Sequence, residues 1–338
     1  MQNARAWIGR IAILGGVLLA AGPLRAQAPL ENVVLANPVI SLSFSMGYIA
    51  EDQGIWAKHG LAVKTIEISG VGALNAVISG SADFAQPSGP SFTRAVAKGQ
   101  KLIAIAASTD RMTVQLVLRK ELAEAAHFDP KAPLAQRAQI LKGRTIAVDA
   151  VNSIIHAYVR LLAKRAGFDP EEIHLAMMQP PNMIAAFAAK SIDGFAMAPP
   201  WTLKPVLEGA ATMIASGPDG DPADVEPFAT VILVTKADTC ETRKGLCEKM
   251  GHAMAEAGAF LLDHPEETLA ILKKRFPTLD DKLLAASYDL LRKMTPRPPI
   301  VDKKSLENDD LVNIDAGLMS PDDKLKSYDG LITDKYVR

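Results

Sequence analysis

The chain has 338 residues, and its 37 Lys and Arg residues against 38 Asp and Glu residues give a formal net charge of −1. Hydrophobic residues make up 49% of the chain, which excludes a disordered or low-complexity protein. The balanced charge, the aromatic content of 5% and the presence of only 2 cysteines argue against a nucleic-acid partner, a base-stacking platform and a Cys-rich zinc or disulfide scaffold.

The first residues have the pattern of a secretory signal peptide. Arg5 and Arg10 precede an apolar run over residues 11–22, and a short stretch with small residues up to Ala28 follows it. The run is too short to span a bilayer, which takes about 20 residues. We expect cleavage after Ala26 to remove residues 1–26 and to leave an exported, soluble, periplasmic chain. An uncleaved anchor helix is the alternative.

Short β-rich runs alternate with helical patterns from residue 33 to residue 107. The predicted strands cover residues 33–36, 61–68, 83–85 and 102–107, and the predicted helices cover 47–59, 73–79 and 90–98. This alternation predicts an α/β unit with a mostly parallel sheet that helices cover on both faces.

A second unit of the same class follows. Its predicted strands cover residues 143–149, 173–178, 193–198 and 213–215, and its predicted helices cover 153–166 and 182–190. The chain then becomes helical over residues 246–262, 265–276 and 280–294.

Two similar extended runs enclose the second unit. Residues 113–120 and 230–236 are both apolar, both begin Thr-Val and both close in Lys. We therefore predict two lobes that the chain connects by two hinge crossings, with residues 27–113 and 232–338 in lobe 1 and residues 114–231 in lobe 2. A ligand cleft would lie between the lobes. The alternative is a pair of independent edge strands whose similarity is accidental.

The two cysteines fit an exported protein. Cys240 and Cys247 lie close together in the sequence, and an oxidising compartment permits a disulfide between them. We expect this disulfide, which would restrain the entry to the helix that follows; two free thiols are the alternative.

The turns that follow the predicted strands are the candidate ligand site, because open α/β sheets bind ligands beyond the carboxyl ends of their strands. These turns are rich in small and polar residues, which expose backbone N–H groups at the start of helices. The alternative is that the same residues only cap their helices. With Trp201, which follows Pro199-Pro200 and could form a wall of the cleft, the candidate ligand-binding residues are Ser45, Met46, Gly70, Gly72, Ala73, Gln86, Ser88, Asp149, Asn152 and Ser153.

Sequence motifs for catalysis are missing. The chain has no Gly-x-Ser-x-Gly elbow, no His-Glu-x-x-His and no Gly-x-x-x-x-Gly-Lys loop, and no His is clustered with carboxylates or Cys at metal-ligand spacing. We therefore expect neither an enzyme nor a resident metal or cofactor.

Four segments in order resemble a known family. They are residues 47–61 (GYIAEDQGIWAKHGL), 80–84 (GSADF), 143–148 (GRTIAV) and 190–195 (KSIDGF), the last with Lys190 where the family usually has Gly. Together they resemble the periplasmic substrate-binding proteins of ABC importers for alkanesulfonates, taurine, nitrate and thiamine-pyrimidine precursors, the NMT1/SsuA-like family. The likeness runs from about residue 33 to residue 295.

The resemblance implies a type 2 periplasmic binding fold, in which a monomer closes on a small polar or anionic solute and docks on a membrane permease. It also implies that Ser45, the turn 70–73, Ser88 and the turn 152–153 line the cleft. Some relatives are pyrimidine-precursor synthases that use a Cys-rich motif, which this chain lacks. An exported enzyme on the same scaffold and the ligand-binding subunit of a sensory system remain the alternatives.

Overall fold

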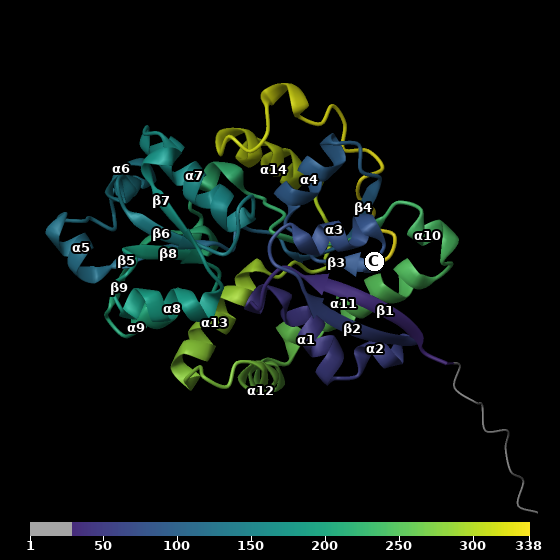
Figure 1. Cartoon of the computed structure of the whole chain (residues 1–338). Coiled ribbons are helices and arrows are strands. Elements are labelled where there is room, and N and C mark those ends of the chain that lie inside the picture. Colours follow the sequence, from purple (N-terminus) through teal and green to yellow (C-terminus); the bar gives the residue numbers. More distant parts are fainter. Residues whose placement is uncertain (1–28) are drawn as a thin grey trace, which may run out of the picture.

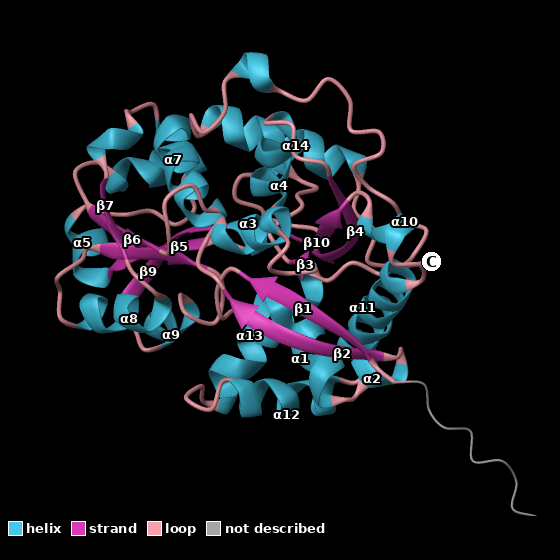
Figure 2. Ribbon diagram, turned by 45° about the vertical axis from the view of Figure 1, so that its right-hand side comes forward, coloured by secondary structure: helices cyan, strands magenta, loops and turns pink. Residues whose placement is uncertain are grey.

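The structure, a computed structural model, describes residues 29–338, so the predicted signal peptide lies outside the described residues. The described chain forms two lobes, each built on a five-stranded sheet with helices packed against it (Figure 1). Figure 2 shows the two sheets in different halves of the molecule, the strands within residues 115–216 on the left and the other strands at the centre and right. The predicted two-lobed α/β fold is confirmed. Among residues 29–338, no helix combines the length and the apolar character that a membrane crossing needs.

The first sheet combines strands from distant parts of the chain. β1 is parallel to β2 and β3, whereas β10 is antiparallel to β3 and β4. The sheet is therefore mixed: β10 alone runs against the other four strands, so most strands are parallel, as predicted, but half of the strand pairs are antiparallel. Its order is β2 (Leu61–Glu67), β1 (Glu31–Asn37), β3 (Phe84–Ala85), β10 (Val231–Lys236) and β4 (Leu102–Thr109).

The second sheet repeats this arrangement. β6 is parallel to β7 and β8, whereas β5 is antiparallel to β8 and β9. Its order is β7 (His174–Met177), β6 (Thr145–Val148), β8 (Gly194–Met197), β5 (Gln115–Arg119) and β9 (Ala211–Ser216).

The two similar sequence runs form β5 and β10, which occupy the same place in the two sheets. Each is the fourth strand in order and pairs with a neighbour on both sides, so the alternative of two edge strands is wrong. The chain passes from β4 to β5 through residues 110–114 and returns from β9 to β10 through residues 217–230. Each passage leads from one sheet directly into the other.

Helices pack against the sheets; five of them were not predicted from the sequence, and one predicted helix is divided in two. The segment predicted as one helix over residues 47–59 forms two, because Gly54 adopts a left-handed conformation (φ 66°) that an α-helix cannot continue. In the lobe with β1, the helices are α1 (Ser45–Asp52), α2 (Ile55–Lys58), α3 (Gly72–Ser79), α4 (Gly89–Ala97), α10 (Thr239–Thr242), α11 (Leu246–Asp263), α12 (Pro265–Arg275), α13 (Asp281–Met294) and α14 (Lys303–Asp315). In the other lobe they are α5 (Lys120–Ala125), α6 (Leu134–Ala138), α7 (Ile154–Ala166), α8 (Pro180–Ala188) and α9 (Leu203–Leu207). The helices that were not predicted are α5, α6, α9, α10 and α14.

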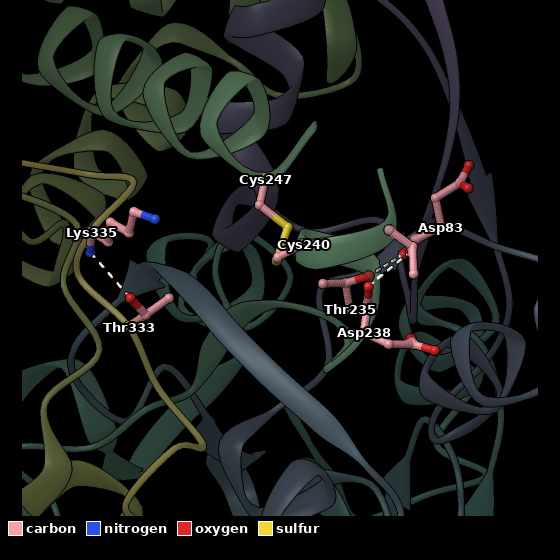
Figure 3. Close-up of a disulfide and its surroundings, with 8 residues drawn as sticks. Asp83, Thr235, Asp238, Cys240, Cys247, Thr333 and Lys335 are labelled. Atoms are coloured by element: carbon pink, nitrogen blue, oxygen red, sulfur yellow. Dashed lines mark hydrogen bonds between the residues drawn. A yellow bond between two sulfur atoms is a disulfide. The ribbon is translucent and has the colours of Figure 1, made fainter. Parts of the chain in front are cut away.

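A disulfide joins Cys240 in α10 to Cys247 in the first turn of α11, as Figure 3 shows. The two Cα atoms lie 5.3 Å apart, a separation usual for disulfides. The predicted pairing is confirmed. Cys247 is buried in the core, so the bond ties the short helix α10 to the buried side of α11.

Removal of the disulfide in the double variant Cys240→Ala/Cys247→Ala should destabilise the protein by about 2–3 kcal/mol, the value expected for closing so short a loop in the unfolded chain. Urea unfolding under non-reducing conditions measures this loss. A reducing agent should lower the stability of the wild type and leave that of the double variant unchanged; equal sensitivity of both proteins would contradict the prediction.

Helix α14, which the sequence analysis did not predict, buries polar residues. It packs against α4 in one lobe and α7 in the other. The Asn313 amide donates a 2.9 Å hydrogen bond to the Pro90 carbonyl, and the Asn308 amide donates a 2.8 Å hydrogen bond to the Pro227 carbonyl. Asp309 is fully buried with both carboxylate oxygens unpartnered, and this burial, together with neighbouring Asp310, raises its pKa well above the usual value.

Asp309→Asn should remove a pH dependence of stability. The folded protein holds the pKa of Asp309 above its value in the unfolded chain. Between these two pKa values the folded state binds a proton that the unfolded chain has lost, so the free energy of unfolding falls as the pH rises from about 4 through the raised pKa. Urea unfolding at several pH values should show this fall in the wild type and a smaller one in Asp309→Asn. The exposed Asp322→Asn serves as control, and an unchanged slope in Asp309→Asn would contradict the account.

Candidate functional site

A cavity lies between the two lobes, at the carboxyl ends of strands from both sheets. Pro38 follows β1, Gln86 follows β3, Asp149 follows β6 and Ala198 follows β8, and all four line it. This is the position where open α/β sheets bind ligands. The cavity volume, as the space open to the centres of water-sized spheres, is about 50 Å³. Its polar lining residues are Ser41, Ser43, Gln86, Ser88, Ser91, Thr113, Asp149, Ser153 and Thr230, and apolar ones include Val39, Phe44, Ile154, Ile155 and Met197.

The first lobe contributes capped helix starts and one amide. Ser88 is the N-cap of α4, and its hydroxyl donates a 3.0 Å hydrogen bond to the Ser91 hydroxyl. Ser41 caps the short 3-10 helix 42–44 in the same way. The Gln86 side chain is fully buried; its Nε2 donates to the Ser108 hydroxyl at 2.8 Å, and its Oε1 has no donor. The Gln86 Oε1 atom is thus a buried acceptor without a partner, with practically no surface exposed to the cavity.

The second lobe contributes a buried carboxyl group. Ser153 is the N-cap of α7, where its hydroxyl accepts from the His156 N–H and donates to Asp149 Oδ1 at 2.5 Å. Burial raises the pKa of Asp149, while the Ser153 hydrogen bond acts in the opposite direction. Asp149 is the only ionisable side chain among the described residues that line this cavity.

Hydrogen bonds between the lobes hold the cavity closed at its rim. Trp201 Nε1 donates to the Ile40 carbonyl at 3.2 Å, and Gln179 Nε2 donates to the Ser69 hydroxyl at 3.1 Å. The first lobe supplies both acceptors and the second lobe both donors. A Cβ added to Gly70, next to Ser69, would lie 2.8 Å from the Cβ of Ala150, so the two lobes leave no room for a side chain at Gly70.

Arg94 makes a third contact between the lobes, deeper in the molecule. Its Nη2 donates to the Asn152 carbonyl of the other lobe at 2.5 Å and to the Ser91 hydroxyl at 3.3 Å, and its Nη1 donates to Asn313 of α14. Burial lowers the pKa of this guanidinium to about 10. The charge of Arg94 is thus used between the lobes, and the side chain does not line the cavity.

The structure brings five of the predicted site residues to the cavity: Gly70, Gln86, Ser88, Asp149 and Ser153. Trp201 lies at an outer hollow that Pro38, Val39 and Gln179 also line, next to its hydrogen bond with Ile40.

The other five predicted residues lie elsewhere. Ser45 donates its hydroxyl hydrogen bond to the Leu42 carbonyl, and Met46 and Ala73 are buried in the cores. Gly72 is half-buried at the start of α3, and Asn152 is exposed with its N–H bonded to His156 Nδ1. Side chains next to each other in a helical turn point in different directions, so adjacency in sequence to a lining residue does not bring these to the cavity.

Five polar lining residues were absent from the predicted site: Ser41, Ser43, Ser91, Thr113 and Thr230. The last two begin the two similar extended runs, so both crossings contribute a hydroxyl to the cavity. The shared Thr-Val start was the signal that could have identified them, because two equivalent strands that leave one cleft begin at equivalent positions.

The chain matches the family described as NMT1/THI5 like over residues 42–268. It belongs to this family. Among the described residues there is no cluster of His, Cys, Asp and Glu that could hold a metal ion.

The relatives of this family member include transport and binding proteins. A putative binding protein of Brucella abortus is 26% identical over 234 residues, which cover 68% of this chain and 67% of that protein. The bicarbonate transport ATP-binding protein CmpC of Synechocystis is 27% identical over 177 residues, which cover 50% of this chain and only 26% of CmpC. The chain thus matches about a quarter of CmpC.

Solved structures share the fold. A Bordetella bronchiseptica protein has a TM-score of 0.79 at 18% identity, with 91% of this chain and 96% of that chain covered. The aliphatic sulphonate binding protein SsuA of Escherichia coli has a TM-score of 0.62 at 19% identity, with 85% and 86% covered. The nitrate-binding protein NrtA of Synechocystis has a TM-score of 0.63 at 15% identity, with 87% and 84% covered. At these identities the likeness describes the fold alone.

Gly70→Ala should prevent full closure of the lobes, because its Cβ would collide with Ala150. In the presence of a stabilising solute, its radius of gyration in small-angle scattering should stay above that of the wild type, and its affinity should fall about tenfold or more. Gly99→Ala is the matched control: Gly99 also has positive φ (84°), yet nothing lies within 4 Å of the added Cβ. Both variants should lose about 1 kcal/mol of stability from backbone strain. Equal compaction of both variants would contradict the role of Gly70.

Proposed function

We propose that the protein is an exported solute receptor of an ABC importer. It captures a small organic solute between its lobes, closes on it and delivers it to a membrane permease. The observation that carries this proposal is the interlobe cavity, which both sheets line with the turns at their carboxyl edges and which both crossings border. Membership of the NMT1/THI5-like family and the fold shared with SsuA and NrtA support it.

The mechanism is closure about the two crossings. The rim contacts Trp201–Ile40 and Gln179–Ser69 form only when the lobes approach, so they contribute to the closed state and not to an open one. A solute that touches both walls makes all of its contacts only in the closed state. It therefore shifts the equilibrium between open and closed states by the difference between its affinities for them. No chemical change of the solute is part of this cycle, and the protein acts as a monomer that a permease recognises when closed.

The relatives' names set the range of solutes to be screened. CmpC is named for bicarbonate transport, SsuA for aliphatic sulphonate binding and NrtA for nitrate binding. Together with the pyrimidine-precursor class, these names define small polar solutes as the first set to be screened. The proposed receptor function holds for a solute of either charge.

A solute that raises the thermal stability of the protein should also compact it, because a ligand bound to the native state stabilises it and this ligand bridges the lobes. Small-angle scattering should show a smaller radius of gyration with the solute bound. Trp201→Phe, which keeps an aromatic ring and loses the N–H donor to Ile40, should bind with about two- to tenfold lower affinity, the value of one hydrogen bond. A tight solute that leaves the radius of gyration unchanged would refute closure as the mechanism.

A further inference from the structure

Helix α14 is fixed to the first lobe by buried contacts with α4. The amide of the fully buried Asn313 donates to the Pro90 carbonyl at 2.9 Å and to the Thr93 hydroxyl at 3.1 Å, and both acceptors belong to α4. Leu306 of α14 is buried in the same hydrophobic cluster as Phe92 of α4. Separation of the two helices would expose this apolar surface to water, which is unfavourable in proportion to its area. Helix α14 therefore moves with the first lobe.

The second lobe presents two arginines of α7 to the C-terminal end of α14. Arg160 Nε donates to the Ala316 carbonyl at 2.6 Å, and Arg165 Nη2 lies 2.9 Å from Asp315 Oδ2. Ala316 is the C-cap of α14, and Gly317 with its φ of 69° turns the chain away after it. The last carbonyls of a helix have no partner within the helix and carry partial negative charge, which attracts cations. The end of α14 is thus a suitable acceptor for both arginines.

The contacts of α14 with α7 are more exposed than its contacts with α4. The side chains of Arg165 and Asp315 are 34% and 37% exposed, whereas Asn313 is fully buried. Arg160 also donates a 2.5 Å hydrogen bond to Glu171 of its own lobe, which it keeps when it leaves α14. Exposed charged contacts are individually weak because water replaces them at little cost. They can therefore break when α7 moves away, while α14 stays on α4.

The contacts between α14 and α7 lie on the other side of the sheets from the rim contacts. In Figures 1 and 2, α4, α7 and α14 lie above the two sheets, and α8, α9 and α12 lie below them. The rim donor Gln179 directly precedes α8, and the rim donor Trp201 lies just before α9. Helix α14 also borders the return crossing, where the Asn308 amide donates to the Val225 carbonyl at 3.1 Å. A rotation of the lobes about the crossings thus moves α7 relative to α14.

We propose that Arg160 and Arg165 of α7 and Asp315 and Ala316 of α14 form a latch, which assembles when the lobes close and stabilises the closed state. None of the four residues lines the cavity. The latch therefore raises the affinity for any solute that closes the lobes, because a larger closed fraction in the free protein lowers the apparent dissociation constant. This inference gives the C-terminal segment a conformational role that the receptor function does not require.

Cross-linking across the rim measures the closed fraction without a solute. Ser69→Cys and Gln179→Cys place one thiol on each lobe at a contact that exists in the closed state. The two native cysteines are joined in the disulfide, so the introduced thiols are the ones that react. A short bis-maleimide joins them only while the lobes are close. The initial rate of intramolecular cross-linking of the mature chain at neutral pH, followed by mass spectrometry, reports how often the lobes meet.

Within this pair of cysteine substitutions, Arg160→Gln and Asp315→Asn should each lower the cross-linking rate about two- to fivefold, the effect of one partly exposed charged contact. Arg165→Gln should have no further effect on that rate in the presence of Asp315→Asn, because the two substitutions remove the same ion pair. Lys142→Gln is the control, since it breaks an exposed 3.0 Å ion pair with Glu172 inside the second lobe and should leave the rate unchanged. Circular dichroism establishes that each variant is folded.

High salt provides a second measurement on the same proteins. Salt screens exposed ion pairs, so it should slow cross-linking more in the protein with an intact latch than in Asp315→Asn.

The outcomes separate the latch from closure itself. Equal cross-linking rates with and without the latch substitutions would overturn the latch and leave closure of the lobes standing. Faster cross-linking in Arg160→Gln would also overturn it, because the contact would then hold the lobes apart. A lack of cross-linking in every protein, although each thiol reacts with a simple maleimide, would overturn the latch together with closure.

Discussion

The pairing of β5 and β10 inside their sheets is the constraint on which the rest of the structure depends. An interior strand has its N–H and C=O groups paired on both sides, so neither strand can shift without losing hydrogen bonds to two neighbours. The chain enters each of these strands directly from a crossing. The crossings are thereby fixed at both ends, and the carboxyl edges of the two sheets are held facing one cavity.

Two ionisable side chains lie near this cavity, one in its lining and one behind it. Next to the solute space lie a carboxyl group and hydroxyls, with Asp149 the ionisable one. Behind it Arg94 joins α4, the Asn152 turn and α14. Helix α14 thus supports the first wall from behind, because Asn313 also bonds to Pro90 at the start of α4. The C-terminal part of the chain contributes to the site although none of its residues lines it.

The fold was predictable from local patterns to the extent that each element has an apolar periodicity of its own. The strands of both sheets, the long helices α7, α11 and α13 and the pairing of Cys240 with Cys247 follow from residue order. Helix α14 was missed because it buries Asn308, Asp309 and Asn313 in place of apolar residues. Its sequence therefore lacks the apolar stripe from which an amphipathic helix is predicted. The break at Gly54 was missed because a glycine within a helical pattern does not by itself show a positive φ.

The sequence by itself determined the alternation of strands and helices, the equivalence of the two runs that begin Thr-Val, and the turns in which a ligand site could lie. Only the tertiary structure decided which member of each turn faces the cavity: Ser153 and not Asn152, Gly70 and not Gly72. It also decided that Asp149 lines the cavity while Arg94 is bonded elsewhere. The physical reason is that a side chain's direction and its partners depend on how segments distant in sequence pack, which local patterns do not encode.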